Sequence, residues 1–374
     1  MKRILSLLLA LVLVLSLAAC GAAKPETTQN PAASSAPTEP ATTEPSTAEP
    51  ATRVFTDSLG REVEVPTNIT KLAVSGPLAQ IVLFALCPDK LVGIASEWDK
   101  TAATYLATEY YNLPILGQLY GGKGELNLEA LLASGAEVVI DVGEPKDTAK
   151  EDLDALQEQT GVPFVHITAM TDTTGNAYRM LGDLLGMPEE AEALASYCEK
   201  AYGMALDLSG KAEKARLLYL LGDTGLNVLA KGSYHAEIID LLADNQAVVE
   251  APSSKGSGNE IDMEQLLIWD PDVILFAPGS IYATVGEDSM WQQLTAIRTG
   301  RYYEVPMGPY NWLGSPPSVQ RYLGMLWMMK LLYPEQTDYD LKAEVQKYYQ
   351  LFYHCELTDE QYDALVANSI GKES

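Results

Sequence analysis

The residues best suited to hold a small ligand are aromatic, cationic and hydroxyl side chains in the loops that follow predicted β-strands. They are Ser75, Trp98, Tyr120, Lys123, His235, Lys255, Tyr310, Trp312 and Arg321. Aromatic faces stack on planar rings or chelates, and Lys or Arg pairs with carboxylates and oxyanions. Because ligands of open α/β sheets bind outside the carboxyl ends of the strands, we expect these residues around a cleft. Such a cleft suits a flat, anionic or metal-chelate ligand, although each residue alone could also be structural.

Catalytic and metal-binding patterns are weak in this chain. His166, His235 and His354 are its only histidines, and they are dispersed, so we expect no site for a bare transition metal and no cofactor. His166 lies in an apolar strand and is interpreted as a core residue, whereas His235 could touch a chelated metal or donate to an anion. Residues 117–123 approach a phosphate-binding loop, but Gly124 stands where Ser or Thr would bind magnesium. The sequence therefore predicts a binding protein rather than an enzyme.

The composition excludes several kinds of partner. The formal net charge is -26, and no basic stripe or Arg-rich helix is present, which argues against nucleic acid and against electrostatic binding to anionic lipid. Cys87, Cys198 and Cys355 show no C-x-x-C spacing. These three cysteines can form at most one disulfide, and whether they form any stays open.

One pattern occurs twice in the chain. Residues 127–140 and 262–275 both read as a capping residue, an apolar residue, Glu, a variable residue and Leu-Leu, followed by an acid and a β-branched run. Asn127 and Asp262 are suitable N-caps, and the apolar residues that follow recur at helical spacing. Each copy is therefore predicted to be a short helix followed by a buried strand, and the duplication predicts two similar α/β lobes.

The N-terminus resembles an export signal. Residues 1–19 have a basic tip and an apolar core, too short for a membrane-spanning domain. The end of this segment, Leu17-Ala-Ala-Cys20-Gly, resembles a bacterial lipobox, which implies cleavage before Cys20 and its lipidation; an ordinary signal with a chance cysteine is the alternative. Residues 20–52 are rich in Pro, Thr and Glu and are predicted to be a disordered tether. We expect a lipid-anchored protein on the outer face of the bacterial cytoplasmic membrane, and the tether length favours a Gram-positive cell.

The rest of the chain alternates strands with helices. Residues 53–57 and 61–65 predict a β-hairpin, and residues 71–74, 91–94, 138–140 and 164–167 predict strands separated by helices. A second series begins with a strand at 216–221 and ends with helices at 318–333, 340–352 and 358–367. Alternation of this kind predicts an α/β fold with mostly parallel sheets.

Several stretches resemble one protein family. Residues 56–66, 71–77, 84–94 and 232–240, together with the duplicated segments, look like the substrate-binding proteins of ABC importers for iron-siderophores, haem and vitamin B12. The similarity extends from about residue 53 to the C-terminus. No single motif decides it, but the order and spacing of the motifs are specific.

The resemblance implies a domain plan. An N-terminal lobe at 53–187 and a C-terminal lobe at 211–374 would be joined by one long helix at 188–210, with the ligand cleft between the lobes. A surface helix packed within one lobe would show the same pattern. A single connecting helix implies only modest closure on ligand.

The resemblance also implies a role for the duplicated glutamates. Glu129 and Glu264 match residues that contact arginines of the permease in this family. A simpler interpretation is that each carboxylate stabilises the start of its own helix by about 0.3–1 kcal/mol. Both interpretations can hold together.

The expected function is capture of a chelated nutrient and its delivery to an ABC permease dimer with ATPase subunits. An iron complex, either a siderophore or haem, is favoured over a corrinoid or an oxyanion such as molybdate or tungstate. A surface adhesin or wall-binding protein is the alternative of a different class. We expect a monomer that contacts the membrane only through its lipid anchor and binds no nucleic acid.

Overall fold

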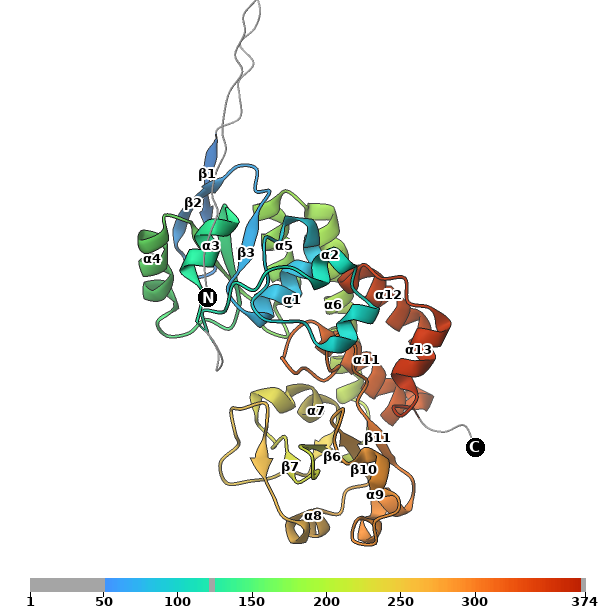
Figure 1. Cartoon of the computed structure of the whole chain (residues 1–374). Coiled ribbons are helices and arrows are strands. Elements are labelled where there is room, and N and C mark those ends of the chain that lie inside the picture. The colour runs from blue at the N-terminus through green and yellow to red at the C-terminus, as the bar shows by residue number, and fades with distance from the viewer. Residues whose placement is uncertain (1–50, 121–124, 371–374) are drawn as a thin grey trace, which may run out of the picture. The chain divides into compact units, whose positions relative to one another are not determined.

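The N-terminal lobe is organised around a three-stranded parallel sheet (Figure 1). The computed structural model describes residues 51–120 and 125–370, which lie within one compact unit. Strands β3 (Leu72–Val74), β4 (Val138–Gly143) and β5 (Phe164–Thr168) pair in that order. Every residue of β4 is buried, as expected for a central strand covered on both faces. The predicted signal peptide, Cys20 and the predicted tether up to residue 50 lie outside the described residues, and Thr52, the last tether residue as predicted, begins β1 (Thr52–Thr56).

Helices and a hairpin surround this sheet. They are the hairpin β1 (Thr52–Thr56) and β2 (Glu62–Pro66), the helices α1 (Pro77–Leu86), α2 (Thr108–Tyr111), α3 (Leu128–Ser134), α4 (Ala149–Thr160) and α5 (Thr174–Leu185), and the short 3-10 helices η1 (Pro88–Lys90) and η2 (Lys100–Thr104). The strand predicted at 91–94 is wrong. In its place Leu91 and Ile94 make only isolated bridges, to Leu72 and Ile115, because the chain turns away from the sheet edge after each.

The C-terminal lobe has a mixed sheet. Its order is β11-β10-β6-β7-β9, with β8 beside β6; β6, β8, β10 and β11 run parallel, whereas β7 and β9 pair antiparallel. The strands are β6 (Arg216–Leu221), β7 (Asn227–Val228), β8 (Asp244–Asn245), β9 (Asn259–Glu260), β10 (Val273–Phe276) and β11 (Tyr302–Glu304). The helices are α7 (Glu237–Leu242), α8 (Met263–Trp269), α9 (Tyr282–Val285) and α10 (Thr295–Arg298), with η3 (Tyr234–Ala236) and η4 (Trp291–Gln293). The predicted class, two α/β lobes with largely parallel sheets, is confirmed.

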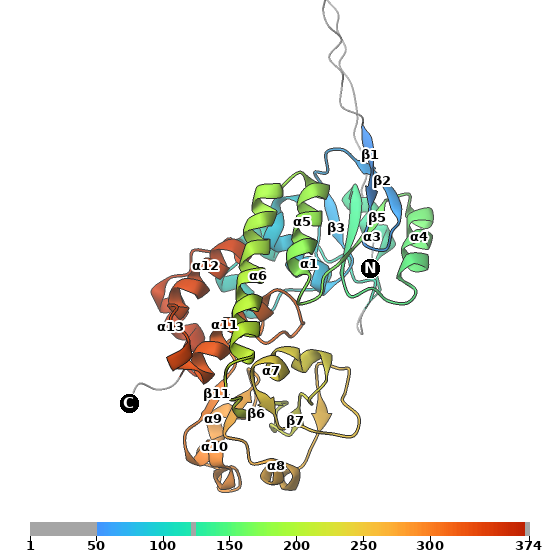
Figure 2. The same ribbon diagram turned by 180° about the vertical axis from the view of Figure 1, so that it is seen from behind.

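Helix α6 (Pro188–Ser209) connects the two lobes (Figure 2). Pro188 at its first position and Glu189 and Glu190 in its first turn suit a helix start. Its 22 residues give a length of about 33 Å. It packs against α5 of the N-terminal lobe and against α7 of the C-terminal lobe.

The last helices pack against one another and against α6, and α12 reaches the N-terminal lobe. They are α11 (Gln320–Leu332), α12 (Leu341–Tyr353) and α13 (Asp359–Val366), with η5 (Pro334–Gln336) between the first two. Helix α12 packs against α1, and the His354 Nε2 lies 3.1 Å from the Phe84 carbonyl oxygen. The lobe boundaries at 53–187, 188–210 and 211–374 stay predictions, and α12 lies on the N-terminal lobe although its residues follow 211.

The duplicated segments form matching helix–strand units. The Asn127 side chain accepts a hydrogen bond from the Ala130 N–H in α3, and the Asp262 side chain accepts one from the Gln265 N–H in α8. Both helices have seven residues and end at a residue with left-handed backbone, Gly135 in the first copy and Asp270 in the second. The cost of this conformation at Asp270 is offset because its carboxylate accepts two hydrogen bonds from Thr295.

Other sequence expectations can be compared with the described residues. Cys87, Cys198 and Cys355 are all free thiols, and the first two are buried. Among residues 51–120 and 125–370, no helix is both long enough and apolar enough to cross a bilayer.

Candidate functional site

A cavity of about 370 Å³ opens at the carboxyl ends of β3 and β4. The N-terminal lobe contributes residues in and just beyond these strands, and the C-terminal lobe contributes two residues of η3 and one of a neighbouring loop. The lining residues are Ser75, Gly76, Pro77, Leu78, Ala79, Tyr120, Asp141, Val142, Gly143, Glu144, Lys146, Tyr234, His235 and Ser254. The position agrees with the general rule for ligand sites of parallel sheets.

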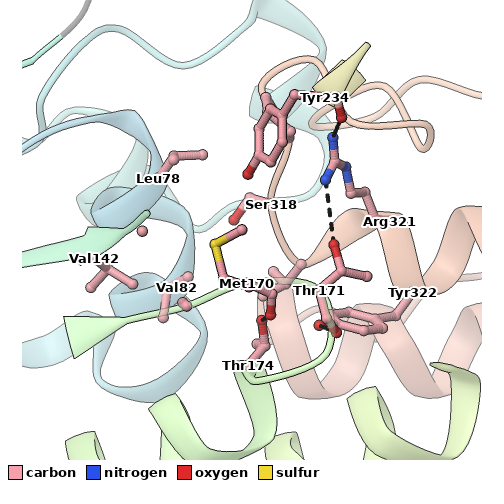
Figure 3. A pocket seen from close by; sticks show the side chains of 14 residues that line it. Leu78, Val82, Val142, Met170, Thr171, Thr174, Tyr234, Ser318, Arg321 and Tyr322 are labelled. Atoms are coloured by element: carbon pink, nitrogen blue, oxygen red, sulfur yellow. Dashed lines mark hydrogen bonds between the residues drawn. The ribbon is translucent and has the colours of Figure 1, made fainter. Parts of the chain in front are cut away.

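A smaller cavity of about 30 Å³ shares Leu78, Val142, Gly143 and Tyr234 with the first. Figure 3 shows this region, with Leu78, Val82 and Val142 on one side and Tyr234 and Arg321 on the other. Most of its lining residues are aliphatic or aromatic, so this part of the site offers apolar contact.

Three neighbouring strands bring three polar side chains together at the main cavity, where Ser75 and Asp141 line the wall and His166 contacts Asp141 without lining the cavity. Ser75 follows β3, Asp141 belongs to β4, and His166 belongs to β5 directly opposite Asp141. The Ser75 hydroxyl donates to Asp141 Oδ1, and His166 Nδ1 lies 2.7 Å from Asp141 Oδ2. All three residues are buried, so the carboxylate has a fixed orientation.

Tyr120 and His235 place neutral polar groups at the cavity. Burial raises the pKa of Tyr120, and a hydrogen bond of 3.1 Å from its hydroxyl to Asp152 Oδ2 raises the pKa further. Burial also lowers the pKa of His235, and the positive charge of Arg321 acts in the same direction. His235 is therefore a neutral hydrogen-bonding group at neutral pH.

Arg321 is held by both lobes. Its Nη1 lies 2.7 Å from Glu237 Oε2, and its Nη2 donates to the Tyr234 carbonyl oxygen at 2.8 Å (Figure 3). The Thr171 hydroxyl, which follows β5, donates to the same Glu237 oxygen at 2.7 Å. The guanidinium carbon also lies 4.8 Å from the centroid of the Tyr234 ring. Arg321 thus holds Tyr234 in place in the cavity wall.

Trp98, Tyr310 and Trp312 do not line either cavity. Trp98 packs edge-on against Phe84 and donates to the Tyr110 carbonyl oxygen at 3.2 Å. Trp312 is 1% exposed, and the rings of Tyr310 and Trp98 are 5.9 Å apart within the core. Tyr310 and Trp312 follow β11, whereas Trp98 follows segment 91–94, which is not a strand. All three pack in the core with the C-terminal helices.

Neither of the two predicted lysines is among the described residues that line the two cavities. Lys255 is exposed and lines neither cavity. Lys123 lies outside the described residues. The structure therefore brings Ser75, Tyr120 and His235 together at the main cavity and places Arg321 at the smaller one, and ligand contact by any of them stays a prediction.

The comparison with known families identifies the fold. A family model described as "Periplasmic binding protein" matches residues 85–307, more than half of the chain. The chain belongs to this family. Members are in general binding proteins rather than enzymes, and they act outside the cytoplasm. Those of ABC importers work with permease and ATPase components. No match is found among curated proteins.

Solved structures agree with the family assignment. An ABC transporter solute binding protein from Sulfurospirillum deleyianum is 27% identical, with a TM-score of 0.75 over 84% of this chain and 99% of that chain. A periplasmic solute binding protein from Veillonella parvula is also 27% identical, with a TM-score of 0.71 over 85% of this chain and 98% of that chain. This periplasmic binding protein is therefore a solute-binding protein of the ABC-transporter kind.

A more distant neighbour supports the fold alone. It is the molybdate-bound MolA of Haemophilus influenzae, 22% identical with a TM-score of 0.65 over 82% of this chain and 99% of that chain. The periplasmic binding protein fold is thus shared with proteins that carry chemically different ligands, and the ligand has to be argued from the site.

Glu129 and Glu264 occupy equivalent exposed positions in the first turns of α3 and α8. Within the described residues of this periplasmic binding protein, neither carboxylate makes a hydrogen bond or an ion pair, so both are available for contacts at the surface. Docking to a permease stays a prediction.

Sequence reasoning missed Asp141 and Tyr234 as cavity residues. Asp141 directly follows the predicted buried strand 138–140, and this position at a strand end could have identified it as a cleft residue. Tyr234 adjoins His235, which was selected. Within the described residues, no group of three or more His, Cys, Asp or Glu side chains could hold a metal ion. The expectation of no cofactor stays a prediction.

Proposed function

We propose that this protein captures an iron complex in the cavity between its lobes and delivers it to an ABC importer. The observation that carries the proposal is that Ser75 and Asp141 from one lobe and Tyr234 and His235 from the other line the same cavity. A site shared by two lobes encloses a small solute on more than one side.

The size and lining of the cavity support a chelate as the ligand. Its volume of about 370 Å³ lies in the range of small-molecule sites, and the smaller apolar cavity extends it. The rings of Tyr120 and Tyr234 offer flat faces for stacking on a chelate or macrocycle. A corrinoid or an oxyanion such as molybdate or tungstate remains an alternative ligand for the same role.

Delivery is proposed to depend on Glu129 and Glu264, one on each lobe. Both carboxylates are exposed at the same offset from an N-cap, so they can contact two equivalent basic sites on a permease dimer. Lipidation of Cys20 would hold the protein near that permease on the outer face of the membrane, and the protein would act as a monomer.

A thermal-shift screen tests ligand capture. The chain from residue 20 with Cys20→Ser would be heated with ferric siderophores, haem, cobalamin, molybdate and tungstate, and with the iron-free siderophores as matched controls. A ligand at 100 times its dissociation constant adds about 2.7 kcal/mol to the unfolding free energy. We expect an iron complex to raise the melting temperature and its iron-free form to leave the melting temperature unchanged. Stabilisation only by cobalamin or an oxyanion would reject the iron complex and keep the transport role.

A further inference from the structure

A carboxylate lies in the inner wall of the cavity with its orientation fixed. The Asp141 side chain is 10% exposed, and Ser75 and His166 each engage one of its oxygens. His166 is in turn held by the Asp57 carboxylate, which accepts from its backbone N–H at 3.2 Å, and by Thr168 Oγ1, 3.2 Å from its Nε2. A network of this depth keeps Asp141 in one position whether or not a ligand is bound.

The charges around Asp141 do not offset it on the cavity side. The described lining residues include two acids, Asp141 and Glu144, and one cation, Lys146, which is exposed at the rim beside Glu144. His235 is neutral at neutral pH because burial and Arg321 lower its pKa. The Arg321 charge is already paired with Glu237.

These observations discriminate between the ligand classes. A polyanionic chelate or an oxyanion would have to approach a buried carboxylate, where repulsion is weakly screened. A neutral or cationic ligand would instead donate a hydrogen bond to that carboxylate, and such charge-assisted bonds are among the stronger ones.

We propose that the cavity selects a neutral or cationic chelate that donates a hydrogen bond to Asp141, and that Asp141 is a specificity-determining residue. This proposal rests on the proposed function, because it takes the ligand to be a captured solute. It narrows the expected iron complexes to neutral or cationic ones. Cationic or neutral hydroxamate chelates fit the description. Ferric triscatecholates, haem with its two carboxylates, and molybdate do not.

Titration calorimetry with ligands sorted by charge and by iron content tests the proposal. The probes are ferrioxamine B (cationic, with iron), aquacobalamin (cationic, without iron), a ferric triscatecholate (anionic, with iron), haem (anionic, with iron) and molybdate (anionic, without iron). We expect the protein to bind at least one cationic probe and none of the anionic probes.

Variants then connect the selectivity to one residue. Asp141→Asn should weaken binding of the cationic probe about tenfold or more, because it removes a charge-assisted hydrogen bond. Asp147→Asn removes the same charge from an exposed residue outside the lining and should change affinity less than twofold. If Asp141→Asn does not fold by circular dichroism, Ser75→Ala replaces it, since it keeps the charge and releases one oxygen; we expect a smaller loss in the same probe.

The outcomes separate this inference from the proposed function. Tight binding of the triscatecholate or haem keeps iron capture and overturns the charge selectivity. Binding of aquacobalamin alone, weakened by Asp141→Asn, keeps the selectivity and overturns iron capture. Binding of a cationic probe that neither Asp141→Asn nor Ser75→Ala weakens overturns the role of Asp141. Binding of none of the probes overturns both proposals.

Discussion

The Thr171 hydroxyl and the Glu237 carboxylate lie 2.7 Å apart and join the N-terminal lobe to the first residue of α7. The same carboxylate oxygen accepts from Arg321 Nη1, and the Thr171 carbonyl oxygen accepts from the Tyr322 hydroxyl at 2.7 Å. Three distant segments of the chain therefore meet at Glu237 Oε2, where the Thr171 hydroxyl and Arg321 both bind. Arg321 also bonds to Tyr234 in the cavity wall.

Removing the Glu237 charge from this network should destabilise the fold more than removing a charge from an exposed ion pair. Glu237→Gln would leave the Arg321 side chain, which is 4% exposed, without its anionic partner. Because a buried charge then lacks compensation, we expect a loss of about 1–3 kcal/mol in the free energy of unfolding, measured by urea denaturation. Asp207→Asn is the matched control, since the Lys211–Asp207 pair is exposed on both sides and should contribute under about 0.5 kcal/mol. Equal losses in the two variants would contradict the assignment.

Charge reversal at the duplicated glutamates should separate delivery from capture. Glu129→Lys with Glu264→Lys should lower cellular uptake of the bound solute about tenfold or more, because like charges would then face each other at the permease. Ligand affinity should not change, since neither residue lines the cavity. The control reverses two other exposed acids, Glu109→Lys with Glu287→Lys. Normal uptake in the first double variant would end the docking proposal.

The contact between α5 and α6 should depend on pH. Arg179 donates to Glu192 and to Glu199, and these hydrogen bonds lower the pKa of both carboxyls, that of Glu192 to about 2. A carboxyl whose pKa is lower in the folded state stabilises the fold above its unfolded pKa of about 4.3. That contribution is lost as the pH falls from about 4.3 to about 2.

Arg179→Met should therefore reduce the urea midpoint at pH 6, and the difference from the parent protein should shrink as the pH falls towards 2.5. Arg298→Met is the control, because Arg298 bonds only to the Gln293 carbonyl oxygen and the Thr295 hydroxyl. A deficit in Arg179→Met that stays constant across this range would show that the arginine acts through packing alone.

The thiols should differ in reactivity. Burial raises the pKa of all three thiols, that of Cys87 to about 12, but Cys355 is only partly buried whereas Cys87 and Cys198 are buried. In a Cys20→Ser chain at pH 8, we expect Cys355 to react first with a thiol-specific disulfide reagent. Cys87 and Cys198 should react only after unfolding in guanidinium, because the thiolate is the reactive form. Rapid modification of Cys87 in the folded protein would contradict its burial.

The sequence predicted the elements well where local pattern and tertiary structure agree. The duplicated helix–strand units, α6 and the three closing helices form close to their predicted bounds, because capping residues and apolar spacing act over a few residues. The strand at 91–94 failed for the opposite reason. Its apolar residues pack against the core, but their backbone finds only single partners at Leu72 and Ile115.

The site was less predictable because it depends on which loops the last helices cover. Trp98, Tyr310 and Trp312 lie in loops and have the right chemistry for ligand contact, yet they pack in the core with α1, α11 and α12. Nothing in the local sequence shows that residues near 350 return to a lobe that begins near 53. Asp141, which the sequence did not single out, and His166, interpreted as a core residue, form a pair only because β4 and β5 are neighbours in register.

The two copies of the duplicated unit end in different ways. In α3, Gly135 adopts the left-handed conformation at no steric cost, so that helix end is set by its own backbone. In α8, Asp270 adopts it while bonded to Thr295 at the start of α10. Local opening of α8 must therefore break a contact with another element, whereas α3 can fray by itself. Amide hydrogen exchange in α3 should therefore report opening of that helix alone. Exchange in α8 should report opening that is coupled to the start of α10.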